Sequence, residues 1–210
     1  MHNVAIFPTD FPTMPSRSPL PQRLLLCATL AMAALLAGCD RSIDKQLAEH
    51  AAAETTLGVT PNEFAGRFNQ KLPDALAGMR VDEPEHMANL YRLDPSRLHP
   101  GQYEYVLETK VGPAQTSMLG TLNKKGELRA VGVLLTDRSQ AARDEFLICA
   151  DSSARSFVSS NPEKLLPLIT RLTSIALNNP GQRMTEVVAN QLLSVEVVPQ
   201  GLLFQVQPQQ

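Results

Sequence analysis

An uninterrupted apolar run near the N-terminus limits what this chain can fold into more than any other feature. Leu24 to Cys39 reads LLLCATLAMAALLAGC, contains no charged residue and follows Arg17 and Arg23. As a helix, the fourteen residues from Leu24 to Ala37 would span only about 21 Å, less than the roughly 30 Å hydrocarbon core of a bilayer. A basic start, a short apolar stretch and small residues at its end are typical of a secretory signal peptide. The folded domain must therefore be built from the residues that follow.

The run closes with the four residues Leu36-Ala37-Gly38-Cys39. This motif resembles the lipobox of bacterial lipoproteins, in which the chain is cut before the cysteine and the cysteine receives lipid. The resemblance implies cleavage between Gly38 and Cys39 and attachment of the mature protein to a bilayer through Cys39. An ordinary secretory cleavage and a short buried helix are the alternatives. The match at both ends of the motif disfavours the first, and the lack of a polar face disfavours the second.

The residue after the cysteine bears on which membrane holds the protein. Asp40 resembles the inner-membrane retention signal of enterobacterial lipoproteins, so the inner membrane is favoured and the outer membrane is the alternative. Lipoproteins carry two or three acyl chains, and each buried CH₂ contributes about 0.8 kcal/mol, so such an anchor would hold stably. We expect the folded domain to lie in the periplasm.

Four parts are expected along the chain. The signal peptide occupies residues 1–38, with either Met1 or Met14 as the true start. The remaining parts are the lipidated cysteine with its tether, a single folded domain and a short tail, at residues 39–58, 59–208 and 209–210. The tether is rich in alanine and charge, and a flexible tether of this length would lift the domain off the bilayer.

The domain is predicted to begin with a helix. Thr60-Pro61-Asn62-Glu63 combines an N-cap threonine, a proline at the first helical position and a glutamate at N3, which is the pattern of a capping box. Apolar residues then follow at helical spacing, and Pro73 is expected to end the helix. The stretch Leu57-Gly58-Val59-Thr60-Pro61 resembles the helix start of the small BamE-type lipoproteins of the β-barrel assembly machinery. That resemblance covers about fifteen residues and implies no functional residue.

The rest of the domain shows runs of strand patterns and helix patterns. Strands are expected at residues 103–111, 115–122, 127–136, 187–188, 193–197 and 202–206, with a further short strand at 88–93. Turns at residues 123–126 and 199–201 are expected to join two pairs of these strands into hairpins. One helix is expected to start at Asp137 or Ser139, and another to follow Asn161-Pro162-Glu163. Because like elements follow one another, the sequence predicts an α+β domain: an antiparallel sheet of about five strands with three helices packed on one face.

Candidate nucleophiles are few. Cys149 is the one thiol left after cleavage, so no internal disulfide is possible, and its apolar neighbours are typical of a buried, inert side chain. Ser152, Ser153 and Ser156 lack a Gly-x-Ser-x-Gly motif, and we interpret them as residues on a helix surface. No catalytic residue is therefore predicted.

Charged residues give no sign of a metal site or of nucleic-acid binding. Asp82, Glu83, Glu85 and His86 match no metal-binding spacing, so we interpret them as a solvated acidic loop and expect no metal and no cofactor. The chain carries 19 Lys and Arg against 21 Asp and Glu, and no stretch groups its basic residues. We therefore expect no nucleic acid partner.

Three functional hypotheses remain. The first is a non-catalytic binding or assembly module of the cell envelope, which would dock an envelope protein on the free face or edge of its sheet. The second is a lipid-anchored inhibitor or immunity-type protein that uses the acidic loop 82–85 as a plug. The third is an envelope hydrolase with His86 or His99 as the base, which no nucleophile motif supports. The first is favoured.

Replacing the predicted lipid acceptor tests the lipobox directly. The Cys39→Ala variant should accumulate as unprocessed precursor and should incorporate no radiolabelled palmitate, because the acceptor thiol is gone. Equal palmitate labelling of the variant and the parent protein would contradict the lipobox.

Overall fold

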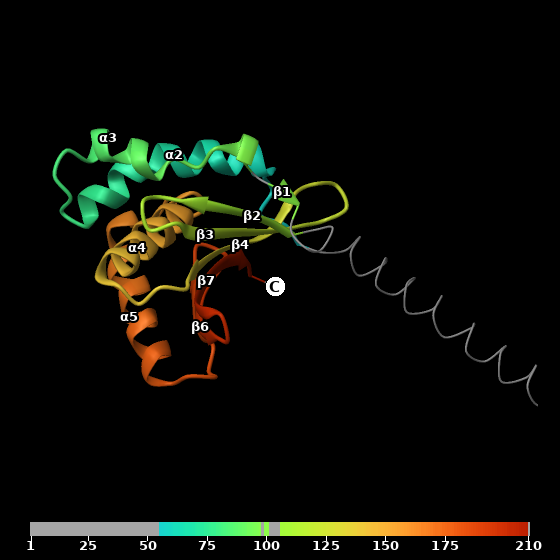
Figure 1. Cartoon of the computed structure of the whole chain (residues 1–210). Helices are drawn as coiled ribbons and strands as arrows, with labels where there is room; N and C mark the ends of the chain where they lie inside the picture. The colour runs from blue at the N-terminus through green and yellow to red at the C-terminus, as the bar shows by residue number, and fades with distance from the viewer. Residues whose placement is uncertain (1–54, 98, 101–105, 210) are drawn as a thin grey trace, which may run out of the picture. The chain divides into compact units, whose positions relative to one another are not determined.

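One antiparallel β-sheet carries the domain, and helices cover one of its faces (Figure 1). The computed structural model describes residues 55–97, 99–100 and 106–209. The sheet has seven strands in the order β1-β2-β3-β4-β7-β6-β5, all antiparallel to their neighbours. The strands are β1 (His99–Pro100), β2 (Val106–Val111), β3 (Thr116–Leu122), β4 (Leu128–Leu135), β5 (Met184–Val188), β6 (Gln191–Val198) and β7 (Gly201–Pro208). The predicted α+β class is confirmed.

Two three-stranded meanders meet in the middle of the sheet. β2, β3 and β4 are joined by short turns, and so are β5, β6 and β7. β4 pairs with β7, with Val133 opposite Phe204, so residues far apart in the sequence share the centre of the sheet. The predicted turns at residues 123–126 and 199–201 connect β3 to β4 and β6 to β7, which confirms both hairpins.

Three long helices form the layer on the sheet: α2 (Pro61–Gly78), α4 (Gln140–Arg155) and α5 (Leu165–Asn178). Figure 1 shows α2 on the side of β2 and β3, α5 on the side of β6, and α4 between them. α4 packs against both other helices and against β3, β4 and β7. A single 3₁₀ turn, η3 (Pro162–Lys164), precedes α5.

The core lies between the helices and the inner face of the sheet. Its largest fully buried side chains come from every layer, among them Phe68, Leu72, Phe146, Ile169 and Phe204. Burying a side chain of this size contributes about 1.5 to 3 kcal/mol. The apolar residues at helical spacing in α2, α4 and α5 thus face one shared core.

Pro73 does not end the first helix, contrary to the sequence prediction. The capping box at Thr60 and Glu63 starts α2 as expected, but the helix continues through Pro73 to Gly78. Pro73 has no N–H to donate to the carbonyl four residues earlier, which weakens the helix at this point. One turn before it, the Ser152 hydroxyl donates to the Phe68 carbonyl at 2.8 Å, and the residues after Pro73 bury Ala75 and Leu76. Packing against α4 therefore carries the helix past the proline.

The segment after α2 is helical, so the strand predicted at residues 88–93 is wrong. It contains α3 (Pro84–Met87) and the 3₁₀ turns η1 (Ala88–Tyr91) and η2 (Pro95–Arg97). The Asn69 side chain accepts from the Leu93 N–H at 2.7 Å and donates to the Leu93 carbonyl at 2.8 Å. Because this amide already satisfies the backbone of Leu93, the segment packs against α2 without joining the sheet.

The chain enters the described domain beside the β3–β4 turn. The Leu57 N–H donates to the Leu128 carbonyl at 2.7 Å, and the Leu128 N–H donates to the Val59 carbonyl at 2.8 Å. No helix in the described part of the chain is long and apolar enough to cross a bilayer.

The residues of the predicted lipidation signal lie outside the described residues. This holds for cleavage at Gly38, lipidation of Cys39 and sorting by Asp40, and also for the first residues of the strand predicted from 103. All of these stay predictions from the sequence.

A buried carboxylate ties the β2–β3 turn to α4. Glu145 is only 3% exposed, and its two oxygens accept from the N–H groups of Ala114 and Thr116, each at 2.9 Å. Gly112 makes this approach possible, because a Cβ at this position would overlap the carboxylate, and its φ of 74° also favours glycine. The turn is thus held by two charge-assisted hydrogen bonds instead of by apolar packing.

Removing this carboxylate should destabilise the domain strongly. Glu145→Ala leaves two N–H groups without their acceptors, so we expect the free energy of unfolding to fall by about 2 to 4 kcal/mol. Denaturant unfolding of the purified protein measures this loss. Glu196→Ala, on the sheet face that the described helices leave uncovered, is the matched control and should change stability by less than about 0.5 kcal/mol. Equal losses for the two variants would show that the carboxylate does not hold the turn.

Candidate binding cleft

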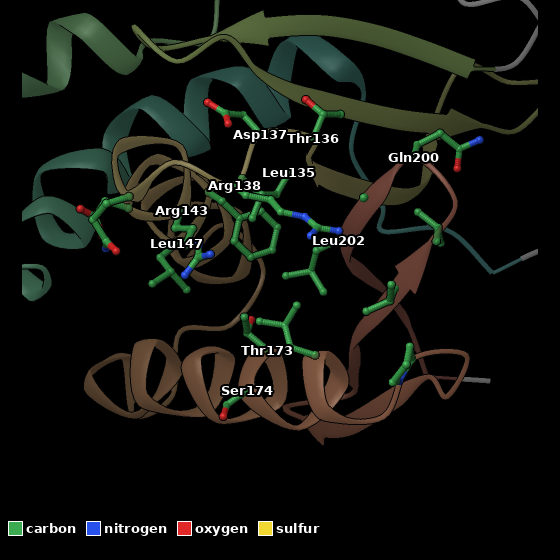
Figure 2. A pocket seen from close by; sticks show the side chains of 18 of the residues that line it. Leu135, Thr136, Asp137, Arg138, Arg143, Leu147, Thr173, Ser174, Gln200 and Leu202 are labelled. Atoms are coloured by element: carbon green, nitrogen blue, oxygen red, sulfur yellow. The ribbon is translucent and has the colours of Figure 1, made fainter.

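A cleft of about 820 Å³ opens where the start of α4, the second half of α5 and the β6–β7 turn meet (Figure 2). Its volume falls within the range of about 300 to 1,000 Å³ that is common for ligand sites. The loop from β4 to α4, residues 136–139, forms one rim, and α5 and the turn at 199–201 form the others. The cleft therefore lies at the end of the central strands and not over the core.

The local sequence explains why α4 begins at this rim. Ser139 is the N-cap of α4, and its hydroxyl accepts from the Ala142 N–H at 3.2 Å. The Asp137 carboxylate in turn accepts from the Ser139 N–H at 3.0 Å and from its hydroxyl at 2.8 Å. These hydrogen bonds from Ser139 hold the pKa of Asp137 below its usual value. The rim thus carries the positive end of a 16-residue helix.

Two arginines line the cleft without a partner in the described part of the chain. Arg138 precedes the N-cap of α4, and Arg143 lies one turn into the helix. Neither guanidinium takes part in a hydrogen bond or ion pair with any residue of 55–97, 99–100 or 106–209. In Figure 2 the Arg138 side chain extends across the cleft toward Leu202. Two exposed guanidinium groups are therefore free to bind an anion.

Two carboxylates also belong to the lining, so the formal charges of the cleft balance. Asp137 is held by Ser139, and Figure 2 shows its carboxylate pointing away from Leu202. Asp144 accepts from the Gln140 side chain at 2.7 Å. Among the described residues, neither carboxylate forms an ion pair with Arg138 or Arg143, so the two guanidinium groups are not neutralised at close range.

The floor of the cleft is mostly apolar, and one polar atom on it lacks a partner. Leucines from β4, α4, α5 and β7 line it together with Phe146: Leu135, Leu147, Leu177 and Leu202. The buried hydroxyl oxygen of Thr173, on the side of α5 that faces Leu202, has no hydrogen-bond partner among the described residues (Figure 2). A buried hydroxyl without a partner costs free energy.

A second, smaller hollow of about 480 Å³ adjoins the first through Asp144. It is lined mainly by apolar side chains from the segment after α2 and from α4, including Met79, Val81, Met87 and Ile148. Tyr91 also lines it, and burial, followed by the charge of Glu145, raises the pKa of this phenol. No cation contributes to this lining, which distinguishes it from the arginine-lined cleft.

The uncovered sheet face, predicted from the sequence as a docking surface, is mixed in character. Leu119 and Leu203 close over Gly132 in its centre, where a Cβ would lie 3.3 Å from Leu203. Beside them the Arg183 guanidinium donates to the Ser194 hydroxyl at 2.8 Å and to the Gln205 side chain at 2.9 Å. These polar groups of the sheet face are thus already bonded to each other, whereas Arg138 and Arg143 of the cleft have no partner among the described residues.

The candidate nucleophiles are not placed for catalysis. The three serines predicted on a helix surface are buried instead, because this side of α4 packs on α2. Ser152 donates to Phe68 and Ser156 to the Ser152 carbonyl, both at 2.8 Å. Cys149 is fully buried, and burial raises the pKa of its thiol, so it is inert as predicted.

The acidic loop and His86 lie on the surface. Asp82, Glu83, Glu85 and His86 are exposed at the start of α3, where Glu83 adopts a left-handed conformation. Within the described residues, no three His, Cys, Asp or Glu side chains are grouped to hold a metal ion. The side chain of His99 lies outside the described residues.

The cleft was not predicted from the sequence. Arg138 and Arg143 precede and follow a helix cap, which alone gives no sign of a binding site. The partner elements, the second half of α5 and the β6–β7 turn, lie further along the chain, from residue 170 onward. Only the fold brings them together.

Comparisons with protein families, curated proteins and solved structures find no significant match for this chain. Its function must therefore be argued from geometry and chemistry.

A buried ion pair within α4 has an unusual titration. Asp151 is fully buried and accepts from the Arg155 Nε at 2.7 Å, while its other oxygen has no hydrogen-bond partner among the described residues. Burial raises the pKa of Asp151 to about 6, although Arg155 opposes the shift. The charged form is therefore penalised in the folded state.

Asp151 should thus make stability depend on pH. Its pKa is higher in the folded than in the unfolded chain, so its contribution is fully present below about pH 4 and is lost as pH rises through about 6. Asp151→Asn keeps an acceptor for Arg155 but has no charge to bury. We expect the melting temperature of this variant, relative to the parent, to rise between pH 4.5 and pH 7.5.

The control for this experiment is Asp137→Asn, because hydrogen bonds lower the pKa of Asp137 instead of raising it. Its melting temperature relative to the parent should change little between pH 4.5 and pH 7.5, because the contribution of Asp137 is lost only as the pH falls below its ordinary pKa of 3.8. A difference between Asp151→Asn and the parent that does not change with pH would contradict the assignment.

Proposed function

We propose that the chain is a non-catalytic binding or assembly module of the bacterial cell envelope, held at a membrane by lipid on Cys39, that receives an envelope protein in the arginine-lined cleft. The inner membrane is favoured by Asp40. The observation that carries the proposal is the cleft itself, which combines an apolar floor, two unpartnered arginines and an unpaired hydroxyl. Few convergent polar groups over an apolar floor are the general form of a binding site.

A binding role fits the chemistry around the cleft better than a catalytic one. The lining contains arginines, carboxylates, hydroxyls and amides, but no histidine, cysteine or lysine that could serve as base or nucleophile at neutral pH. Its two carboxylates already accept hydrogen bonds from Ser139 and Gln140. The residues supply contacts and orientation instead of proton transfer.

Anchoring suits such a module because it confines the domain to the surface where its partner lies. A lipid anchor raises the local concentration of the two proteins without any additional contact between them. A cleft of moderate affinity is then sufficient for function.

Site-specific photo-crosslinking in living cells tests the proposal. A photoreactive benzoylphenylalanine at Gln200 or Ser174, both exposed at the rim, should give a crosslinked envelope protein that mass spectrometry identifies. The same residue at Gln70, on the exposed side of α2, is the control and should give no such product.

Two results would contradict the proposal. One is the absence of any adduct from the rim positions, and the other is the same set of adducts from the rim and from Gln70. Either result would show that the cleft is not the site where the partner binds.

A further inference from the structure

We propose that the segment received by the cleft is an extended peptide in which a carboxylate lies beside apolar side chains; this inference rests on the proposed function and names the chemistry of its partner. The carboxylate would bind Arg138 and Arg143, and the apolar side chains would lie on the leucine floor. The carboxylate can belong to an Asp or Glu side chain or to the end of a chain.

The charge of the ligand follows from the arginines and from the helix. Both guanidinium groups line the same cleft and have no partner among the described residues, and a guanidinium pairs with a carboxylate through two parallel hydrogen bonds. The start of α4 adds the positive end of its dipole at the same rim. A cation would meet two guanidinium groups there that form no ion pair with Asp137, Asp144 or any other described residue.

The polar rim favours a peptide over a simple fatty acid. Hydroxyl and amide side chains surround the floor, contributed by the loop after β4, by α4, by α5 and by the β6–β7 turn: Thr136, Gln140, Thr170, Ser174 and Gln200. Gln140 and Thr170 already donate to Asp144 and to the Leu166 carbonyl, but the side chains of Thr136, Ser174 and Gln200 have no partner among the described residues. An alkyl chain offers these three no hydrogen bond, whereas a peptide backbone carries one donor and one acceptor per residue.

Selection from random peptides tests this chemistry without knowledge of the partner. The purified full-length protein is used to select from two libraries of random dodecapeptides, one with a fused and one with a free C-terminus. Enriched peptides should carry an acidic residue, or a free terminal carboxylate, next to two or more apolar residues. The two libraries separate the side-chain source of the carboxylate from the terminal one.

The enriched peptide is then labelled and its affinity measured by fluorescence anisotropy. The double variant Arg138→Gln with Arg143→Gln should bind it at least about tenfold more weakly, because each arginine supplies charge-assisted hydrogen bonds. The matched control, Arg67→Gln with Arg92→Gln, removes the same charge from exposed positions outside the cleft and should bind as the parent does. An unchanged melting temperature of the double variant separates lost contacts from lost folding.

Several outcomes would overturn the inference. One is the enrichment of peptides without a carboxylate, and another is equal affinity for the double variant and its control. A third is that no peptide is enriched, whether palmitate alone binds in the cleft or no ligand does. The crosslinking result is independent of these outcomes, since a partner captured at Gln200 would keep the proposed function even when its binding segment is not acidic.

Discussion

The hydrogen bonds of Glu145 are the interaction on which much of this domain depends. They fix the β2–β3 turn to α4, and α4 is the one helix that contacts both other long helices and the central strands β4 and β7. Without that tie, the first meander would be attached to the helical layer mainly through apolar packing, which sets no direction. A carboxylate with two fixed N–H donors sets both distance and orientation. The position of α4 on the sheet in turn determines where the β4–α4 loop lies, and this loop forms a rim of the cleft.

The same helix also carries polar groups into its interface with α2. Ser152, Ser153, Ser156 and Asp151 are all buried there, at a cost that apolar residues of similar size would not incur. Ser152 offsets part of that cost because it bonds the Phe68 carbonyl near Pro73, and Arg155 offsets part of it for Asp151. The first of these bonds joins the two helices, whereas the second lies within α4. The Ser152–Phe68 bond thus fixes α4 against the part of α2 that precedes Pro73.

Local patterns in the sequence predicted most helices, strands and turns well, but predicted the burial and the partners of their side chains poorly. The capping box at Thr60 and the turn residues around Gly126 and Gly201 specify their own neighbourhoods, so the helix start and the two hairpins could be predicted. Pro73 misled because its effect depends on α4, which lies about 70 residues away in the chain. The serines of α4 misled for the same reason, since only the packing of α2 decides whether that side is exposed. Arg138 and Arg143 could not be predicted as site residues, because the elements that face them, α5 and the β6–β7 turn, come later in the chain.

The arrangement of the cleft also separates binding from stability at the level of single residues. Arg138 and Arg143 are exposed and have no partner in the described structure, so their loss removes no contact that the fold needs. Leu202 and Phe146 belong to the floor and to the core at once, so substitutions there change both the cleft and the stability of the domain. Substitutions at the rim therefore test ligand binding, whereas substitutions in the floor test binding and stability together. A lower affinity for the ligand in a rim variant therefore reports on recognition. The position of α4 is fixed by the hydrogen bonds of Glu145 and by the apolar side of the helix, and neither depends on the two guanidinium groups.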